Sequence, residues 1–503
     1  MNKFLSAVHL SVSASATKSV MTVGRRHYQR ILSKFEKFDN PTINNVDIQT
    51  SILKSKLSNN YDTRHINGFY NYHKSSGNFI VSVDDNKYLD TFCNIATIPL
   101  GYNNPKLLDK FNEKEFLPLL LHRNALGLMP PSEWSSLIGD IVRNMAPSGL
   151  EFMHAGCGCG TGANENAIKA TFLYKYYKEN DIDMNKKDSV LHYGTCMANS
   201  PPGSPDYEIL SFRNGFHGRS LGCLSLSHSK AVHKVGIPAF KWNKSDFPEL
   251  KYDNSTNTII SNKNEEERIL EQVHNHFSKN ANIAGLIIEP IQSEGGDNHA
   301  SNYFFKELRT MCKEFDIIFI ADEVQTGMGS TGKFWAHEHW DLDTPPDIVT
   351  FAKKAQISGF FARSDLMPPH PYQIYGTWMG DAPRTMLLKE ILSVMKEDNI
   401  IENVCETGNY LYENLVEFQN RGLIQNLRGK GKGTYIAFDI FMNKKVAEDE
   451  RVLMVQQLKQ DMRQDGVIVG TCGKQESIRL RPSLIFEKYH ANIFLEKLEN
   501  ILK

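Results

Sequence analysis

Residues 317–323 read IIFIADE, an apolar run that ends abruptly on two acids, Asp322 and Glu323. Because the run has no polar alternation and is rich in β-branched residues, it is typical of a strand buried on both faces of a parallel sheet. In open α/β sheets the groups that bind ligands lie at the carboxyl ends of such strands. We therefore predict an α/β fold with a large, mainly parallel sheet and a functional carboxylate at Asp322.

A second apolar run, residues 348–352, ends on Lys353 and Lys354. Pyridoxal 5'-phosphate requires a lysine that forms a Schiff base with it and an acid beside its pyridinium nitrogen. An acid pair alone more often caps a helix, and a lysine pair alone more often lies in solvent. Their succession at the ends of two strands predicts pyridoxal 5'-phosphate as the cofactor.

The block as a whole is more specific than either part. Residues 322–327 read DEVQTG, residues 332–340 read GKFWAHEHW and residues 351–354 read FAKK. This order resembles the class III, or omega-amino, aminotransferases of the fold type I pyridoxal phosphate family, most narrowly the mitochondrial members that act on 4-aminobutyrate. The resemblance extends over almost all of the chain after its N-terminal segment. It implies a large parallel-sheet domain and a smaller α/β domain built from both chain ends.

The resemblance also implies a reaction. Transamination of 4-aminobutyrate with 2-oxoglutarate, by a ping-pong mechanism, would give succinate semialdehyde and glutamate. Two other interpretations stay open. Another class III enzyme would act on β-alanine, ornithine or a polyamine, and β-alanine is shorter than 4-aminobutyrate by a single methylene. An inactive homologue would only bind, but we would expect it to have lost Lys353 or Asp322, and both are present.

The two adjacent lysines have to be separated. The class pattern selects Lys353 as the Schiff-base lysine, whereas counting back from residues 358–359 favours Lys354. We predict Lys353, because FAKK matches the 4-aminobutyrate enzymes, in which the first lysine is used. Once released, Lys353 would act as general base on the substrate carbon. By the same resemblance Asp322 holds the pyridinium protonated and Gln325 donates a hydrogen bond to the phenolic oxygen of the ring.

A glycine-rich loop precedes a helical pattern at residues 156–164, which read GCGCGTGAN. Glycines allow backbone N–H groups to close on a phosphate, and a helix N-terminus favours its negative charge. The motif alone is weak, because it lacks the lysine of a P-loop. In the resembled family this loop is the phosphate cup, which implies Gly160 and Thr161 as cofactor ligands, with Asn164 supporting the loop.

The cysteines of this loop raise a separate question. Some mitochondrial 4-aminobutyrate enzymes carry Cys-x-x-Cys here, and two subunits share an iron–sulfur cluster through those thiolates. Aligned on residues 164–167, Cys159 occupies the first position but Gly162 occupies the second. Cys157 with Cys159 has a different spacing, and cluster ligation needs a full set of cysteines. We therefore predict no metal, and the cluster remains an open question.

Further site residues follow from the resemblance alone. Phe216 would stack on the pyridine ring, and Arg219 would hold the substrate carboxylate in a bidentate grip. Two glutamates after a buried strand would face the site, and the second would pair with an arginine as a gate for the α-carboxylate of glutamate or 2-oxoglutarate. These residues are Glu289, Glu294 and Arg479. Ile95 would touch the substrate. Thr377 would bind the cofactor phosphate of a neighbouring subunit, which implies a homodimer.

Composition limits the possible partners. The chain has 503 residues and a formal net charge of −1, which gives no reason to expect nucleic acid or an anionic membrane as partner. Its 8 cysteines are scattered, which suits a reducing compartment. No apolar run approaches the ~20 residues that span a bilayer. We predict a soluble globular enzyme for small amino and keto acids, with neither a nucleic-acid nor a membrane partner.

The N-terminal segment differs from the rest of the chain. Residues 1–35 are basic and serine-rich and contain no Asp or Glu, as in a mitochondrial transit peptide. A secretory signal fits less well because the arginines follow the apolar run, and an untargeted tail is the other alternative. We predict the mitochondrial matrix. The expected domains are residues 1–35 as transit peptide, 36–135 as N-terminal arm with part of the small domain, 136–388 as large cofactor-binding domain and 389–503 as C-terminal small domain.

Other patterns predict local structure. Residues 78–90 are typical of a β-hairpin, and residues 208–212 and 284–289 are typical of buried strands, the second ended by Pro290. Residues 177–204 and 252–267 are polar and are expected to be surface insertions. After residue 389 strand and helix patterns alternate, with strands expected at 435–440 and 466–470 and a helix near 451–454.

Overall fold

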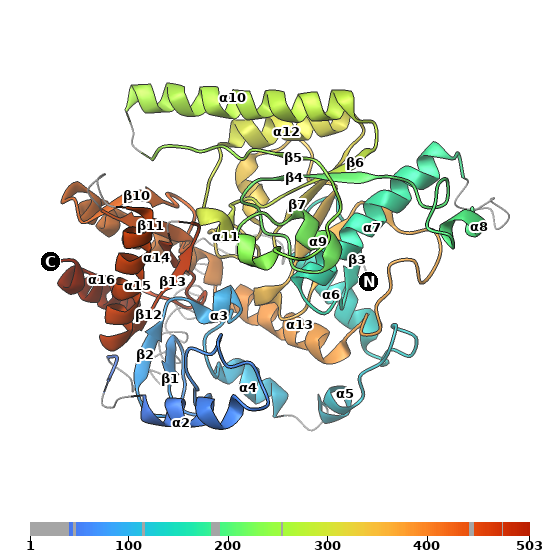
Figure 1. Cartoon of the computed structure of the whole chain (residues 1–503). Coiled ribbons are helices and arrows are strands. Elements are labelled where there is room, and N and C mark those ends of the chain that lie inside the picture. The colour runs from blue at the N-terminus through green and yellow to red at the C-terminus, as the bar shows by residue number, and fades with distance from the viewer. Residues whose placement is uncertain are drawn as a thin grey trace, which may run out of the picture.

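The strand that ends at Asp322 is the middle strand of a seven-stranded sheet in the computed structural model (Figure 1). The structure describes residues 40–43, 47–112, 116–182, 192–252, 255–441, 447–474 and 476–503. The strand order is β3-β9-β8-β7-β6-β4-β5, and all neighbours are parallel except those of β9. The predicted mainly parallel sheet is therefore confirmed. Its strands are β3 Phe152–Ala155, β4 Glu208–Phe212, β5 Lys244–Ser245, β6 Ile283–Ile288, β7 Ile318–Asp322, β8 Ile348–Phe351 and β9 Gly359–Ala362.

Helices cover both faces of this sheet, which explains why its strands lack polar alternation. Along β7, Phe319 and Ala321 face one apolar core, whereas Ile318 and Ile320 face the other. The first core is closed by α6 Trp134–Met145, α10 Thr256–Lys279, α12 Asn302–Glu314 and α13 Ala382–Glu397. The second is closed by α7 Gly160–Glu179 and α9 Leu221–Leu226. In Figure 1, α10 and α12 lie side by side along the outer edge of the molecule.

The two ends of the described chain meet in a smaller layer, where the first strands lie against the last helices (Figure 1). The predicted hairpin is confirmed, and β12 joins it in parallel next to β2. A second small sheet has the order β10-β11-β14-β13. The strands are β1 Phe79–Val81, β2 Lys87–Asp90, β10 Ile424–Arg428, β11 Ile436–Ile440, β12 Val467–Ile468, β13 Gly470–Cys472 and β14 Ser477–Leu480. The helices are α14 Ile400–Asn420, α15 Glu448–Gln464 and α16 Lys488–Leu502.

The remaining elements are short, apart from α2, and one of them is left-handed. Cys93, Asn94, Ile95 and Ala96 all have φ between +48° and +64°. Non-glycine residues rarely adopt this conformation, and it tends to mark functional sites. The elements are α2 Ile48–Leu57, α3 Cys93–Ala96, α4 Pro105–Phe111, α5 Leu117–Leu121, α8 Tyr193–Cys196, α11 Ser293–Gly296, η2 Ala231–His233, η3 Ala336–Trp340, η4 Lys353–Ala355 and η5 Ser364–Leu366.

Two expectations from the sequence need refinement. Most of the segment 252–267, expected as a polar surface insertion, forms the first half of α10, and most of its residues from 256 on are exposed or half-buried. The strand expected at residues 466–470 is divided, because β12 and β13 belong to different sheets.

Residues 1–35, the predicted transit peptide, lie outside the described residues, and the predicted domain boundaries stay predictions. Within the described ranges no helix is both long and apolar enough to span a membrane.

Candidate active site

A cavity of about 650 Å³ opens beside the carboxyl ends of β4, β6, β7 and β8. This is the edge at which an open α/β sheet is expected to bind its ligand. The chain segments that follow these strands contribute most of its lining. The sequence-predicted residues among them are Gly160, Thr161, Phe216, Arg219, Glu289, Asp322, Gln325 and Lys353. The structure thus brings together residues that the sequence spreads from position 160 to position 353.

Asp322 is held in one orientation by several donors. Its Oδ2 accepts hydrogen bonds from Asn164 Nδ2 and His217 Nδ1, each at 2.8 Å, and its Oδ1 accepts from the Val324 N–H at 3.1 Å. The carboxylate is only 4% exposed, at the end of β7. Asp322 lines the cavity, which is the position required of an acid that pairs with a pyridinium nitrogen.

Lys353 and Lys354 lie on different sides of η4. Lys353 lines the cavity, and its Nζ donates to the Ile95 carbonyl at 3.3 Å. Lys354 is buried outside the cavity, where its Nζ donates to the Ala96 carbonyl at 3.3 Å. Burial is the main cause that lowers the pKa of Lys353 to about 8 and that of Lys354 to about 7. Because only Lys353 combines a lowered pKa with access to the cavity, the geometry supports the choice of Lys353.

The glycine-rich loop leads from β3 into α7, which begins at Gly160. Gly156 and Gly158 have φ values of +88° and +84°, and a side chain on Gly156 would meet the backbone of residues 378–380. A Cβ on Gly158 would meet nothing within 4 Å, so there is open space in front of the helix. Thr161 also lines the cavity, and its Oγ1 lies 2.8 Å from Ser220 Oγ. A long helix with a glycine loop at its N-terminus suits a phosphate.

The polar groups that line the cavity fit pyridoxal 5'-phosphate. Among the described residues, the buried Asn164 Oδ1 and Ser358 Oγ have no hydrogen-bond partner, and both residues line the cavity. Buried polar atoms of this kind normally have partners, so they are available to a bound polar molecule. Asp322, Lys353 and the start of α7 all line the cavity and suit the ring nitrogen, the aldehyde and the phosphate of this cofactor.

The residues expected near the substrate form two groups. In the first, Glu289 Oε1 accepts from the Phe216 N–H at 2.8 Å, and the Arg219 guanidinium lies 5.8 Å from the centre of the Phe216 ring. Burial, assisted by the charge of Asp322, raises the pKa of Glu289 well above its usual value.

The second group is an ion pair. Arg479 Nη2 lies 2.8 Å from Glu294 Oε1. Although burial acts in the opposite direction, the neighbouring Arg479 lowers the pKa of Glu294 below its usual value. The predicted contact between Glu294 and Arg479 is present, therefore, although neither residue lines the cavity itself.

Ile95 and Thr377 lie outside the cavity lining. Ile95 is 42% exposed, and its carbonyl rather than its side chain contacts Lys353. Thr377 is exposed, and its carbonyl accepts a hydrogen bond from the Leu126 N–H at 2.8 Å. Their roles toward a substrate and toward a neighbouring subunit stay predictions.

Several residues of the site were missed from the sequence. His217 contacts Asp322, and its signal was its place directly after Phe216 in the same loop. Arg481 and Tyr435 contact Gln325 from the C-terminal part of the chain. These two contacts span 156 and 110 residues, and no local pattern indicates them. Arg384 at the start of α13 also lines the cavity.

The packing of the glycine-rich loop decides whether a cysteine could fit at the position of Gly162. A Cβ at Gly162 would overlap the Cys157 carbonyl oxygen, so the loop as it stands has no room for the second cysteine of a Cys-x-x-Cys motif. Burial is the main cause that raises the pKa of Cys157 to about 11, which disfavours its thiolate. In the part of the chain that the structure describes, no three His, Cys, Asp or Glu side chains are grouped to hold a metal ion.

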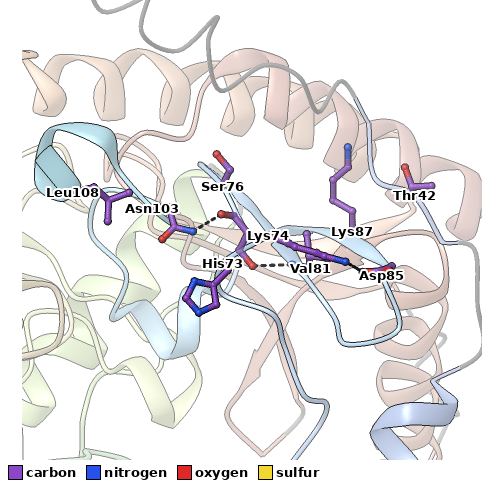
Figure 2. Close-up of a pocket in the computed structure, with 10 residues that line it drawn as sticks. Thr42, His73, Lys74, Ser76, Val81, Asp85, Lys87, Asn103 and Leu108 are labelled. Atoms are coloured by element: carbon purple, nitrogen blue, oxygen red, sulfur yellow. Dashed lines mark hydrogen bonds and ion pairs between the residues drawn. The ribbon is translucent and has the colours of Figure 1, made fainter. Parts of the chain in front are cut away.

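A second, larger hollow of about 830 Å³ lies in the N-terminal part of the chain (Figure 2). Lys74 extends across it to Asp85, at 2.6 Å, and Asn103 Nδ2 donates to the Ser75 carbonyl at 2.7 Å. None of the sequence-predicted site residues lines this hollow. The cavity beside Asp322 is therefore the candidate active site.

A doubly covered parallel sheet, with an acid and a lysine at neighbouring strand ends and a glycine loop at a helix start, defines a pyridoxal-phosphate-dependent transferase of fold type I. Comparison with known proteins narrows this class. The sequence profile of the family described as "Aminotransferase class-III" matches residues 60–502. The chain belongs to the class III aminotransferases, and its cofactor is pyridoxal 5'-phosphate.

The chain is similar to curated proteins over most of its length. It is 42% identical to "4-aminobutyrate aminotransferase" of Dictyostelium discoideum, over 90% of this chain and 89% of that protein. It is 40% identical to "4-aminobutyrate aminotransferase, mitochondrial" of Sus scrofa, over 90% of this chain and 88% of that protein. Among solved structures, "Lysine aminotransferase from M. tuberculosis in the internal aldimine form" has a TM-score of 0.77 at 25% identity, over 90% of this chain and 100% of that chain.

Proposed function

We propose that this enzyme transfers the amino group of 4-aminobutyrate to 2-oxoglutarate, yielding succinate semialdehyde and glutamate in two half-reactions. Two relatives at 40–42% identity carry the name 4-aminobutyrate aminotransferase. The observation in the structure that carries the proposal is the ion pair of Glu294 and Arg479, 2.8 Å apart. It lies close enough to Lys353 for the charges to influence the lysine's pKa.

The ion pair allows one site to accept two kinds of substrate. 4-Aminobutyrate has no carboxylate on the carbon that bears its amino group, so Arg479 can stay paired with Glu294 while this substrate binds. Glutamate and 2-oxoglutarate have a carboxylate at that position, and Arg479 would bind it once Glu294 moves away. A guanidinium suits this exchange because it holds either carboxylate with the same fork of N–H donors. Arg219, which lines the cavity, would hold the carboxylate that both substrates share.

Pyridoxal 5'-phosphate, when bound, supplies an aldehyde that binds the amine covalently and a ring that withdraws electrons from the reacting carbon. The remaining roles in the reaction belong to residues of the chain. Lys353 would hold the aldehyde and, after its release, carry a proton at Nζ away from the substrate carbon and back. A pKa lowered to about 8 leaves part of this amine neutral near neutral pH.

We assign the surrounding residues accordingly. Asp322, fixed by Asn164 and His217, keeps the ring nitrogen protonated. The remaining assignments are Phe216 to the ring face, Gln325 to the ring oxygen, Gly160 and Thr161 to the phosphate, and Ile95 and Glu289 to the substrate side. We further propose a homodimer in which Thr377 of each subunit completes the phosphate site of the other.

We also propose that the enzyme works in the mitochondrial matrix. Residues 1–35 have the composition of a transit peptide, and the Sus scrofa relative is named mitochondrial. The Dictyostelium discoideum relative carries no such word in its name. Fusing residues 1–35 to a fluorescent protein tests the assignment: import into mitochondria is expected, and a diffuse signal would contradict it.

The substrate is tested by separating the half-reactions. Adding 4-aminobutyrate to the purified enzyme, without a keto acid, should remove the visible absorbance of the cofactor, and 2-oxoglutarate should restore it. β-Alanine and ornithine are the comparison amines. An enzyme whose absorbance responds to one of these but not to 4-aminobutyrate would overturn the assigned substrate and leave the aminotransferase class intact.

A further inference from the structure

The side chain of Gln325 is held from behind by two buried donors from the C-terminal part of the chain. Gln325 Oε1 accepts a hydrogen bond from Arg481 Nε at 3.0 Å and another from the Tyr435 hydroxyl at 3.2 Å. Arg481 and Tyr435 are each 1% exposed and lie behind Gln325, outside the lining of the cavity. Gln325 itself lines the cavity. The amide therefore has one end in a buried network and the other toward the cofactor site.

The hydrogen-bonding chemistry of an amide decides whether the oxygen or the nitrogen of Gln325 faces the two buried donors. Its oxygen only accepts and its nitrogen only donates. Turning the Gln325 amide over would place its N–H groups against the Arg481 N–H and deprive a buried donor of its acceptor, which is costly. With both donors satisfied by Oε1, the nitrogen Nε2 is left to face the cavity. The orientation of this amide is thus determined by residues that do not touch the cavity.

Both donors are themselves fixed. The Arg481 guanidinium is paired with the buried Asp297, donates from Nη1 to the Leu480 carbonyl at 2.8 Å, and lies 3.2 Å from the centre of the Tyr435 ring. The Tyr435 hydroxyl also contacts Ser293 Oγ. Burial raises the pKa of Tyr435 above its usual value, so its hydroxyl stays protonated and can donate.

We propose that Tyr435 and Arg481 are positioning residues that fix the Gln325 amide so that it donates an N–H into the cofactor cavity. The proposal rests on the proposed function, in which this N–H meets the ring oxygen of pyridoxal 5'-phosphate. It also connects the ring to the ion-pair gate. Ser293, which contacts the Tyr435 hydroxyl, offers its main-chain oxygen to Arg479 Nη1 at 3.5 Å.

The test uses the holoenzyme without substrate. Tyr435→Phe removes one donor and keeps the ring on which Arg481 lies, and Gln325→Leu removes the amide altogether. A donated N–H stabilises negative charge on the ring oxygen and so lowers the pH at which the visible absorbance titrates. We expect Gln325→Leu to raise this midpoint by about one pH unit, the order of a lost hydrogen bond to a charged group, and Tyr435→Phe by about half of that. Cofactor affinity, measured by titrating cofactor-free protein, should weaken in the same order.

Tyr252→Phe is the matched control. The Tyr252 ring also faces a guanidinium, that of Arg428 at 5.5 Å, but Tyr252 does not line the cavity or contact Gln325. The pH midpoint of the absorbance titration of Tyr252→Phe should equal that of the unaltered enzyme. If Gln325→Leu shifts the midpoint and Tyr435→Phe does not, Tyr435 does not position the amide, and thermal unfolding shows whether its role is only structural. If neither variant shifts it, Gln325 donates nothing to the ring, and the proposal is equally wrong. Because no amine is added, this result can be interpreted even if the assigned substrate is wrong.

Discussion

The carboxylate of Glu294 lies 2.8 Å from the guanidinium of Arg479, and the two side chains are 17% and 3% exposed. Glu294 belongs to α11 beside the large sheet and Arg479 to β14 of a small sheet, so the ion pair joins the two layers of the molecule. Attraction in such a pair has to offset the cost of removing both charges from water, and loss of one partner leaves the other uncompensated. We expect the pair to open only for a substrate that supplies a replacement carboxylate.

Replacing Glu294 by Gln should therefore affect the two half-reactions differently. Arg479 would be left as an uncompensated buried cation near the cavity, and 4-aminobutyrate has no second carboxylate to pair with it. We expect kcat/KM for 4-aminobutyrate to fall by roughly tenfold or more, the order of breaking a buried charge pair, and that for 2-oxoglutarate to change much less. Single-turnover absorbance measurements on each half-reaction check this. Equal losses in both would show that the pair does not act as a gate.

The two adjacent lysines should differ sharply in their effect on the cofactor. Lys353→Ala removes the amine inside the cavity and should lower kcat by about a thousandfold or more, with loss of the covalently held cofactor. Lys354→Met removes an amine that lies outside the cavity, so the visible absorbance and most of the activity should remain. Absorbance after borohydride treatment, followed by peptide mapping, identifies the modified lysine. A label on Lys354 would reverse the assignment.

Lys354 should also make stability depend on pH. Burial lowers its pKa from 10.5 to about 7, so between these values the folded state binds fewer protons than the unfolded state, and stability rises with pH. The destabilisation is complete below pH 7 and vanishes above pH 10.5. We expect cofactor-free Lys354→Met to exceed the unaltered protein in its free energy of unfolding at pH 6 by a few kcal/mol, about what such a shift represents, and by less at pH 9.

Urea unfolding at the two pH values measures this difference. Lys241→Met, at an exposed lysine, is the control, and it should show no pH-dependent gain. A Lys354→Met protein that is less stable than the unaltered chain by the same amount at both pH values would mean that Lys354 is charged and well paired in the folded state.

Residues at the ends of buried strands were predictable from the sequence because burial on two faces leaves a simple pattern. Asp322 follows the apolar run of β7, and Lys353 follows that of β8. The glycine-rich loop before α7 was predictable for a similar reason, since glycines before a helix are a local signal. These residues reach the cavity through the regular geometry of neighbouring strands.

Residues that reach the site from the small layer were not predictable in this way. Tyr435 and Arg481 flank β11 and β14, and nothing in their local sequence indicates that they contact Gln325. The left-handed turn at residues 93–96 was equally hidden, because its residues are not the glycines that such a conformation favours. Tertiary packing over long sequence separation, rather than local preference, determines both features.

His217 and His337 offer a matched pair for testing what holds Asp322. Each histidine uses Nδ1 to contact a buried carboxylate, Asp322 at 2.8 Å and the adjacent Glu323 at 2.9 Å, but only His217 lines the cavity. Both His217→Leu and His337→Leu should lower the free energy of unfolding by about 1–3 kcal/mol, because each leaves a buried acceptor short of a donor. Only His217→Leu should also weaken cofactor binding, by about tenfold, since Asp322 would no longer be held against the ring nitrogen. Denaturant unfolding and cofactor titration of the two variants separate these effects, and equal losses of cofactor affinity would show that His217 supports the fold and not the ring.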